Sequence, residues 1–306
     1  MNDQETKSIL TIALVAAFAD GLKDERERAA VKRVAEALGP EAGFDMPGLY
    51  RDVLLSKPDL TQLAAVLQSQ ESRQLAYEMA VGVCDADGAQ GPAETEFLTK
   101  LAGVLNLPAT VAGNVNTSAD SVANATFEAA APVTGTVLGK ASISAAEMDQ
   151  MILNASITNA ALELLPESSA SMAIIPLQLR LVYRIGKAHG YEMDRSHAKD
   201  FLATLGVGLT SQYLEQFGRK LLGGLLGGIG RQAASSGLTF ATTYALGRVA
   251  QRYYSAGRTL DTATLKQTFA SLLDEARGLA PRYQGEIERK AGSIDTRSLA
   301  SLIKQV

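Results

Sequence analysis

The sequence predicts an all-α protein made of two helical domains. Apolar residues recur at helical spacing through most of the chain, and no stretch shows the alternating β-branched pattern of a sheet strand. The composition is 46% hydrophobic and 20% charged, which is typical of a folded globular protein. A central segment of Ala, Thr, Ser, Asn, Val and Gly, almost without charge, separates the two helical parts.

We expect an acidic helical domain over 1–112, a linker over 113–144, a helical domain over 145–275 and a short helical tail over 276–306. Residues 1–112 hold 10 Lys and Arg against 17 Asp and Glu, whereas residues 166–306 hold 18 against 11. The acidic front indicates cations or basic partners, and the basic rear indicates anionic surfaces such as phospholipid. Docking of the two parts on one another explains the same split.

The first domain opens with a helix that is expected at the middle of a bundle. Residues 8–18 are apolar on nearly every side, and Asp20-Gly21 ends this segment. A second helix is expected over 24–38, where Gly39-Pro40 stops it. The later helices expected in this domain cover residues 60–67, 72–83 and 92–105.

An acidic turn before the last of these helices is the main candidate site. Asp85 and Asp87 lie in the turn, and Glu94 follows in the first turn of the helix. The Asp87-to-Glu94 spacing matches the end of an EF-hand calcium loop, although Val83 stands where the first ligand would be. The alternative is capping, because the helix dipole favours an anion at the position of Glu94. Both interpretations stay open.

An earlier acidic turn repeats this arrangement. Asp20 and Glu27 have the seven-residue spacing of Asp87 and Glu94, displaced by 67 residues. Asp24 and Glu27 also fit a capping box, which we favour over metal binding at this turn. The expected cofactor is a divalent cation, Ca²⁺ or Mg²⁺, bound weakly because no full cage of oxygen ligands is present.

The second domain is expected to contain a glycine-rich segment. Its other helices are expected over 145–165, 174–189 and 198–214. Within 221–247 the only charged residue is Arg231, and pairs of glycines four residues apart let helix backbones approach closely. The paired glycines are Gly223, Gly224, Gly227 and Gly228. The segment either contacts a membrane leaflet or a second copy of the chain, or packs inside a helical bundle.

The acidic turns and two later segments carry resemblances to known families. Through Ala19-Asp20-Gly21 and Asp85-Ala86-Asp87-Gly88, residues 9–107 resemble the tellurite-resistance TerB-like family, which implies an all-helical module with a cation-binding face. Through Ile175-Pro176-Leu177-Gln178 and Thr243-Tyr244-Ala245-Leu246-Gly247, residues 174–255 resemble the YcjF-like GTPase-associated family of unknown function. That resemblance implies a helical module near a GTPase or an inner membrane.

Neither catalysis nor a nucleotide is expected. Two histidines and one cysteine do not supply a nucleophile with its base. Gly139-Lys140-Ala141 lacks the Ser or Thr of a phosphate loop, and no strand precedes Gly228-x-Gly230 as a dinucleotide site requires. The basic rear has neither runs of clustered Arg nor aromatic residues interleaved with them, which argues against nucleic acid.

We therefore expect a non-enzymatic protein in which a module that binds divalent cations is fused to a module that contacts a membrane surface, a GTPase partner or itself as a homo-oligomer. The resemblances suggest a role in a stress response. The alternative is a structural adaptor whose acidic face binds a basic protein, with metal incidental. The single Cys84, with Asp3 and Glu5 in place of a basic leader, predicts a cytoplasmic location, free or peripheral to the inner face of the membrane.

Overall fold

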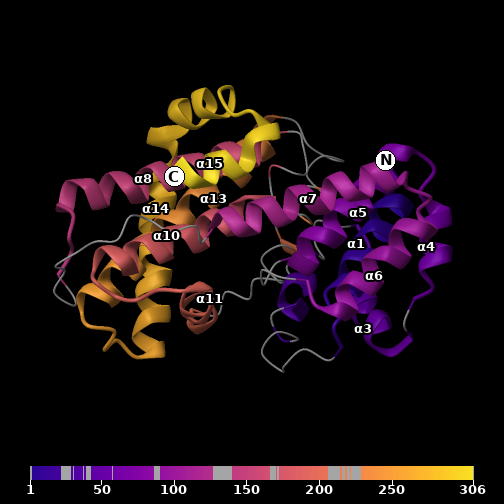
Figure 1. The fold of residues 1–306 in the computed structure, drawn as a ribbon, viewed down its shortest axis with the longest axis horizontal. Helices are drawn as coiled ribbons and strands as arrows, with labels where there is room; N and C mark the ends of the chain where they lie inside the picture. Colours follow the sequence, from indigo (N-terminus) through magenta and orange to yellow (C-terminus); the bar gives the residue numbers. More distant parts are fainter. Residues whose placement is uncertain are drawn as a thin grey trace. The chain divides into compact units, whose positions relative to one another are not determined.

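The described part of the chain is built from α-helices joined by turns, so the predicted all-α class is confirmed (Figure 1). The computed structural model describes residues 2–21, 29, 31–36, 38, 43–56, 58–85, 90–126, 140–165, 170, 172–205, 214–215, 218, 221 and 229–305. The chain forms two compact units. The first comprises Met1–Ala123 with Gly208–Gly228, and the second comprises Asn124–Val207 with Ile229–Val306.

The first unit is arranged around its N-terminal helix. Its helices are α1 (Asp3–Ala16), α3 (Met46–Ser56), α4 (Leu60–Val66), α5 (Gln70–Cys84), α6 (Pro92–Val104) and most of α7 (Ala109–Thr126). Helix α1 contacts α3, α4 and α5, while α4 and α5 contact α6. Most residues of α1 are buried on all sides, so the predicted central helix is confirmed. It ends before Gly21, whose φ of 104° lies in the left-handed region that favours glycine.

Polar side chains at the start of α1 tie it to the rest of the unit. Asn2 and Glu5 form a capping box, in which Glu5 N donates to Asn2 Oδ1 at 2.9 Å and Asn2 N donates to Glu5 Oε2 at 3.0 Å. Ser8 Oγ donates to the carbonyl oxygen of Leu63 at 2.7 Å. The polar groups that α1 buries are therefore hydrogen-bonded, as burial requires.

Helix α7 extends into the segment expected as a linker. It ends at Thr126, so the predicted linker of 113–144 begins inside a helix. Tyr77 of α5 donates a hydrogen bond from its hydroxyl to Asn116 Oδ1 at 3.2 Å, and Ala119 and Val122 are buried. Packing on the unit thus stabilises a helix whose own sequence has weak helical propensity.

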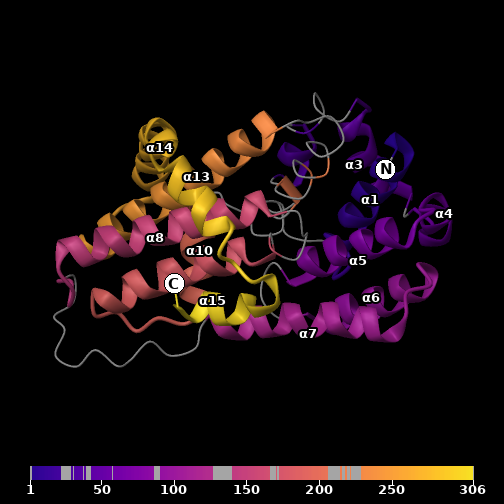
Figure 2. The same cartoon turned by 90° about the horizontal axis from the view of Figure 1, so that it is seen from above.

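The second unit is a helical bundle around α13. Its helices are α8 (Ala145–Leu164), α10 (Ile174–Ala188), α11 (Arg195–Thr204), α13 (Ile229–Ser255), α14 (Thr262–Ala291) and α15 (Leu299–Gln305), with a 3-10 turn at Thr296–Ser298. Helix α13 contacts α8, α10 and α14, and α8 contacts α10 and α14 (Figure 2). The rings of Phe240 in α13 and Tyr283 in α14 stack with centroids 5.4 Å apart in the core.

The predicted domain boundaries stay a prediction, and the two compact units differ from them in two places. Residues 208–228 belong with the first unit rather than with the expected domain of 145–275. The expected start of the tail, residue 276, falls inside α14, which continues without a break to Ala291.

Candidate functional site

The acidic turn of the first unit connects two helices that contact each other, α5 and α6. Asp85 is the C-cap residue of α5, and its carboxylate oxygens are buried. Glu94 lies in the first turn of α6 and is only 5% exposed, and its Oε2 accepts a hydrogen bond from Gly91 N at 2.7 Å. Helix capping is therefore an observed role of Glu94. The two carboxylates flank residues 86–89, which lie outside the described residues.

The other predicted metal ligands are only partly in view. Asp87, Asp24 and Glu27 lie outside the described residues. Asp20 is exposed in the turn that follows α1. Within the described ranges, no three His, Cys, Asp or Glu side chains gather as a metal site would require. A cation site at either turn therefore remains a prediction.

Of the glycine-rich segment 221–247, the structure describes Leu221 and residues 229–247. Gly223, Gly224, Gly227 and Gly228 lie outside the described residues, and Arg231 is placed in α13 by its backbone alone. From Ser236 to Gly247, α13 buries most of its residues in the bundle. For these residues the interpretation as close helix packing holds.

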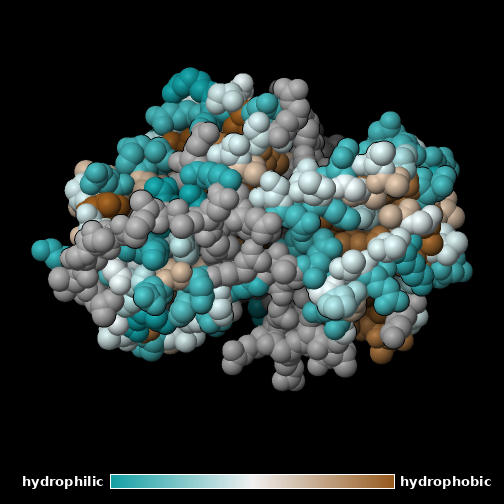
Figure 3. Space-filling model, in the orientation of Figure 1, coloured by the Kyte–Doolittle hydropathy of each residue, from teal (hydrophilic) through white to brown (hydrophobic). Residues whose placement is uncertain are grey.

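None of the described helices combines the length and apolarity needed to cross a bilayer. On the face drawn in Figure 3, hydrophobic residues are scattered among hydrophilic ones. Leu55, 78% exposed, is the one large hydrophobic side chain that is strongly exposed among the described residues.

The histidines and the cysteine make structural contacts. Nδ1 of the buried His189 lies 2.9 Å from the carbonyl oxygen of Ile185, one turn earlier in α10. His197 Nδ1 lies 2.8 Å from Asp194 Oδ1, in the first turn of α11. Cys84 is buried at the end of α5. These contacts do not pair a nucleophile with a base in the described part of the chain.

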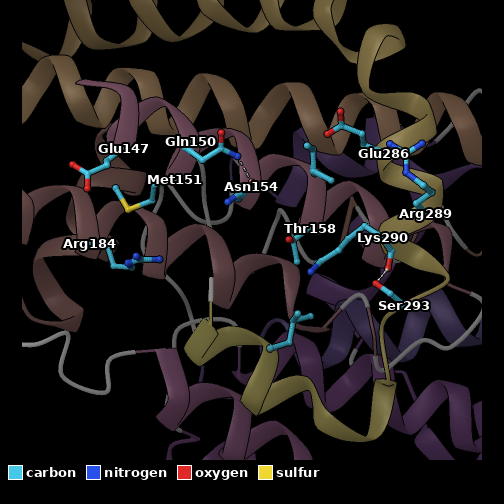
Figure 4. Close-up of a pocket in the computed structure, with 12 residues that line it drawn as sticks. Glu147, Gln150, Met151, Asn154, Thr158, Arg184, Glu286, Arg289, Lys290 and Ser293 are labelled. Atoms are coloured by element: carbon cyan, nitrogen blue, oxygen red, sulfur yellow. Dashed lines mark hydrogen bonds between the residues drawn. The ribbon is translucent and has the colours of Figure 1, made fainter. Parts of the chain in front are cut away.

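A pocket of about 790 Å³ in the second unit was not predicted from the sequence (Figure 4). Helices α8, α10 and α14 line it, and α15 contributes one residue. Its charged residues are Glu147, Arg184, Glu286, Arg289 and Lys290. No sequence signal would have found it, because these residues come from separate helices, and α14 lies far along the chain from α8 and α10.

The lining of the pocket contains three cationic side chains and two acidic ones. Arg184 is half-buried, and burial, together with the charge of Arg180, lowers the pKa of its guanidinium. Glu147 accepts hydrogen bonds from Ser144 N at 2.8 Å and from Ser144 Oγ at 2.7 Å. These bonds lower the pKa of Glu147 and engage its carboxylate in the cap of α8. Glu147 therefore has a structural role as part of the N-terminal cap of α8.

Comparison of the chain with protein-family models, with curated proteins and with solved structures returned no match. The likeness to the TerB-like and YcjF-like families therefore stays a resemblance in sequence motifs.

Proposed function

We propose that the protein is a non-enzymatic binding protein whose first unit takes a divalent cation at the acidic turn of residues 85–94. The observation that carries the proposal is the burial of the Asp85 and Glu94 carboxylates at the two ends of this turn. Asp87 lies between them in the sequence. Burial disfavours the charged form of a carboxylate, and a bound cation would stabilise that form by neutralising its charge. Ca²⁺ and Mg²⁺ prefer the carboxylate and carbonyl oxygens that such a turn contains.

Binding at this turn should be weak. The Glu94 carboxylate already accepts a hydrogen bond from Gly91 N, so it would have to share its oxygens between this bond and the cation. A site with few protein oxygens leaves much of the coordination to water. Mg²⁺ tolerates this arrangement, because it usually keeps several of its waters, whereas tight Ca²⁺ binding needs a cage of protein oxygens. We therefore expect affinities in the range of about 10⁻⁴–10⁻³ M, as in weak calcium modules.

For the second unit we propose a contact role, with a membrane surface, a GTPase or a second copy of the chain as partner. The second unit holds 17 Lys and Arg against 14 Asp and Glu, and its last part, residues 229–306, holds 11 against 6. This local excess supports the proposal, since anionic surfaces attract such a charge. The adaptor alternative assigns the acidic turn to a basic protein partner instead. Metal dependence separates the two.

Titration of the full-length chain with Ca²⁺, Mg²⁺, Mn²⁺ and Zn²⁺ tests the cation site, with thermal melts and calorimetry as readouts. At least one ion should stabilise the fold, by about 2.7 kcal/mol at one hundred times its Kd. Asp87→Asn should abolish the stabilisation. Asp52→Asn, an exposed position in α3, is the matched control and should leave it unchanged. The absence of any shift at about 10 mM ion, where a Kd of about 10⁻³ M or tighter should give at least about 1.4 kcal/mol, would overturn the proposal.

Two substitutions at Glu94 separate ligation from capping. Gln at this position keeps the hydrogen bond to Gly91 N but removes the charge, so Glu94→Gln should weaken cation binding and leave stability nearly unchanged. Glu94→Ala also loses the cap and should cost about 1 kcal/mol of stability. If Glu94→Gln binds the ion as the wild type does, Glu94 is a cap only.

A further inference from the structure

The geometry points to a second binding site: we propose that the pocket lined by α8, α10 and α14 binds the phosphate group of an anionic ligand through Arg184 and Lys290, with Arg289 at its edge. This proposal concerns residues of the second unit and is independent of the cation site in the first. Nothing in the sequence motifs pointed to this site. It rests on the charge, burial and lining of the pocket.

The three cationic side chains of the pocket, Arg184, Arg289 and Lys290, form no ion pair among the described residues. Exposed cations often have no partner, and Arg289 is exposed. Arg184 and Lys290, however, are half-buried, so each has given up part of its hydration without gaining an anion.

Arg184 also lies near a second guanidinium. The charge of Arg180, which is 7% exposed, helps to lower the pKa of Arg184. Arg180 donates a hydrogen bond from Nη2 to the carbonyl oxygen of Lys304 at 3.0 Å, so it is directed toward α15. Arg184 is left to face the pocket. An anion bound there would offset the repulsion between the two cations.

No ion pair joins the acidic lining residues to these cations in the described part of the chain. The Glu147 carboxylate is bound to Ser144 in the helix cap, and in Figure 4 its side chain points away from the centre of the pocket. Glu286 is exposed. The Lys290 side chain, by contrast, extends toward Thr158 across the pocket (Figure 4).

The remaining lining identifies the kind of ligand. Arg and Lys beside hydroxyl-bearing residues form the usual surroundings of phosphate, and Thr158 and Ser293 are among the residues that line this pocket. The Ser293 hydroxyl already donates to the carbonyl oxygen of Lys290 at 2.7 Å, so the cations are the main donors to a bound phosphate. Met151, Ile157 and Leu302 add apolar surface. A volume of about 790 Å³ falls within the range of small-molecule sites and exceeds what a bare phosphate fills. The ligand should therefore carry an apolar body next to its phosphate.

Stabilisation of the helix end does not account for all of these cations. Arg289 and Lys290 lie in the last turn of α14, where positive charge interacts favourably with the helix dipole. Arg184 lies within α10, four residues before its end at Ala188, and besides burial the charge that shifts its pKa is that of another cation, Arg180. A role in ligand binding accounts for all three together.

Isothermal titration calorimetry of the full-length chain with phenyl phosphate, and with inorganic phosphate as the smaller probe, tests the site. We expect phenyl phosphate to bind more tightly, because it offers an apolar body. Binding should weaken on acidification from pH 8 to pH 5.5, since a phosphate monoester loses its second charge near a pKa of about 6. It should also weaken with salt.

Substitutions assign the binding to the pocket. Arg184→Gln and Lys290→Gln should each weaken phenyl phosphate binding roughly tenfold or more, the loss expected for a charge-assisted hydrogen bond. Arg282→Gln is the matched control, because Arg282 is exposed on the same helix and does not line the pocket. Lys290→Gln keeps the test valid if Arg184→Gln fails to fold in circular dichroism melts.

Flotation with vesicles distinguishes the two sources of the phosphate. Binding to phosphatidylglycerol vesicles that is lost in Lys290→Gln, with no binding of phenyl phosphate, assigns the site to a lipid headgroup. Binding of phenyl phosphate without flotation assigns it to a soluble phosphate ester. The proposal is overturned if the wild type binds neither, or if Arg282→Gln weakens binding as much as Lys290→Gln. Asp87→Asn should leave phosphate binding unchanged, so failure here is distinct from failure of the cation site.

Discussion

A single hydroxyl in the core of the second unit holds two buried amides. Thr243 Oγ1 of α13 accepts a hydrogen bond from Asn159 Nδ2 of α8 at 3.2 Å and another from Gln178 Nε2 of α10 at 3.0 Å. All three side chains are 0% exposed. Because buried amides need partners, this triad sets how the three helices can pack on one another. Two of these helices also line the pocket with Arg184 and Thr158.

Replacement of Thr243 should therefore destabilise the second unit. Thr243→Val keeps the shape of the side chain but removes the acceptor, and we expect a loss of about 1–3 kcal/mol in the free energy of unfolding. Thr242→Val, at a half-buried position on the same helix, is the control and should change stability little. Urea denaturation measures both. Equal midpoints for the two variants would show that the triad does not stabilise the bundle.

At the scale of the elements, α13 approaches its neighbours at different distances along its length. A Cβ placed on Gly247 would lie 2.8 Å from Ile152 Cγ2 of α8 and 3.1 Å from Leu181 Cδ2 of α10. The nearest atom to a Cβ placed on Gly237 would be the Cβ of Ala280 in α14, at 3.8 Å. Gly247 is thus required by close packing, whereas Gly237 has room for a methyl group.

Two alanine substitutions in α13 should accordingly act in opposite directions. Gly247→Ala should lower the free energy of unfolding by about 1–3 kcal/mol, because the added methyl overpacks the contact with α8. Gly237→Ala should raise it by up to about 1 kcal/mol, because alanine favours the helix. Thermal or chemical unfolding of the two variants against the wild type gives the sign of each change. A Gly247→Ala variant that is as stable as the wild type or more stable would contradict the close contact at Gly247.

At the scale of the whole molecule, the first unit includes a segment from far along the chain. Residues 208–228 group with it, and Leu214 and Leu221 of this segment are buried. Leu38 is 1% exposed, and a Cβ at Gly218 would overlap its side chain. The first unit as described is thus not contained in residues 1–112 alone.

A double-mutant cycle in the full-length chain tests this long-range contact. Gly218→Ala should destabilise by about 1–3 kcal/mol through overpacking. Leu38→Ala should cost about 2–5 kcal/mol and leave a space. In the Leu38→Ala background the methyl of Gly218→Ala has room, so the two changes should couple by about 0.5–3 kcal/mol. Additive effects would mean that the segment does not pack on Leu38.

The features that could be predicted from the sequence are those that depend on neighbours in the chain. The apolar run of α1 and a break at Asp20-Gly21 were predicted, as was the start of α6 at Pro92, because periodicity, turns and caps are local. The helix itself ends earlier, at Ala16. The capping interpretation of Glu94 followed from the same local signals and is now an observed hydrogen bond. Its role as a cation ligand is not a local property, and it stays a prediction.

The features that only the tertiary structure decided depend on residues brought together from distant parts of the chain. Helix α7 is stabilised by Tyr77 and by burial, which a segment of low helical propensity does not reveal. The membership of residues 208–228 in the first unit rests on contacts such as that of Gly218 with Leu38. The pocket joins Arg184 to Lys290 across two helices. The sequence alone determined the helical class, because hydrogen bonds and periodicity act over a few residues, whereas burial and electrostatics act through space.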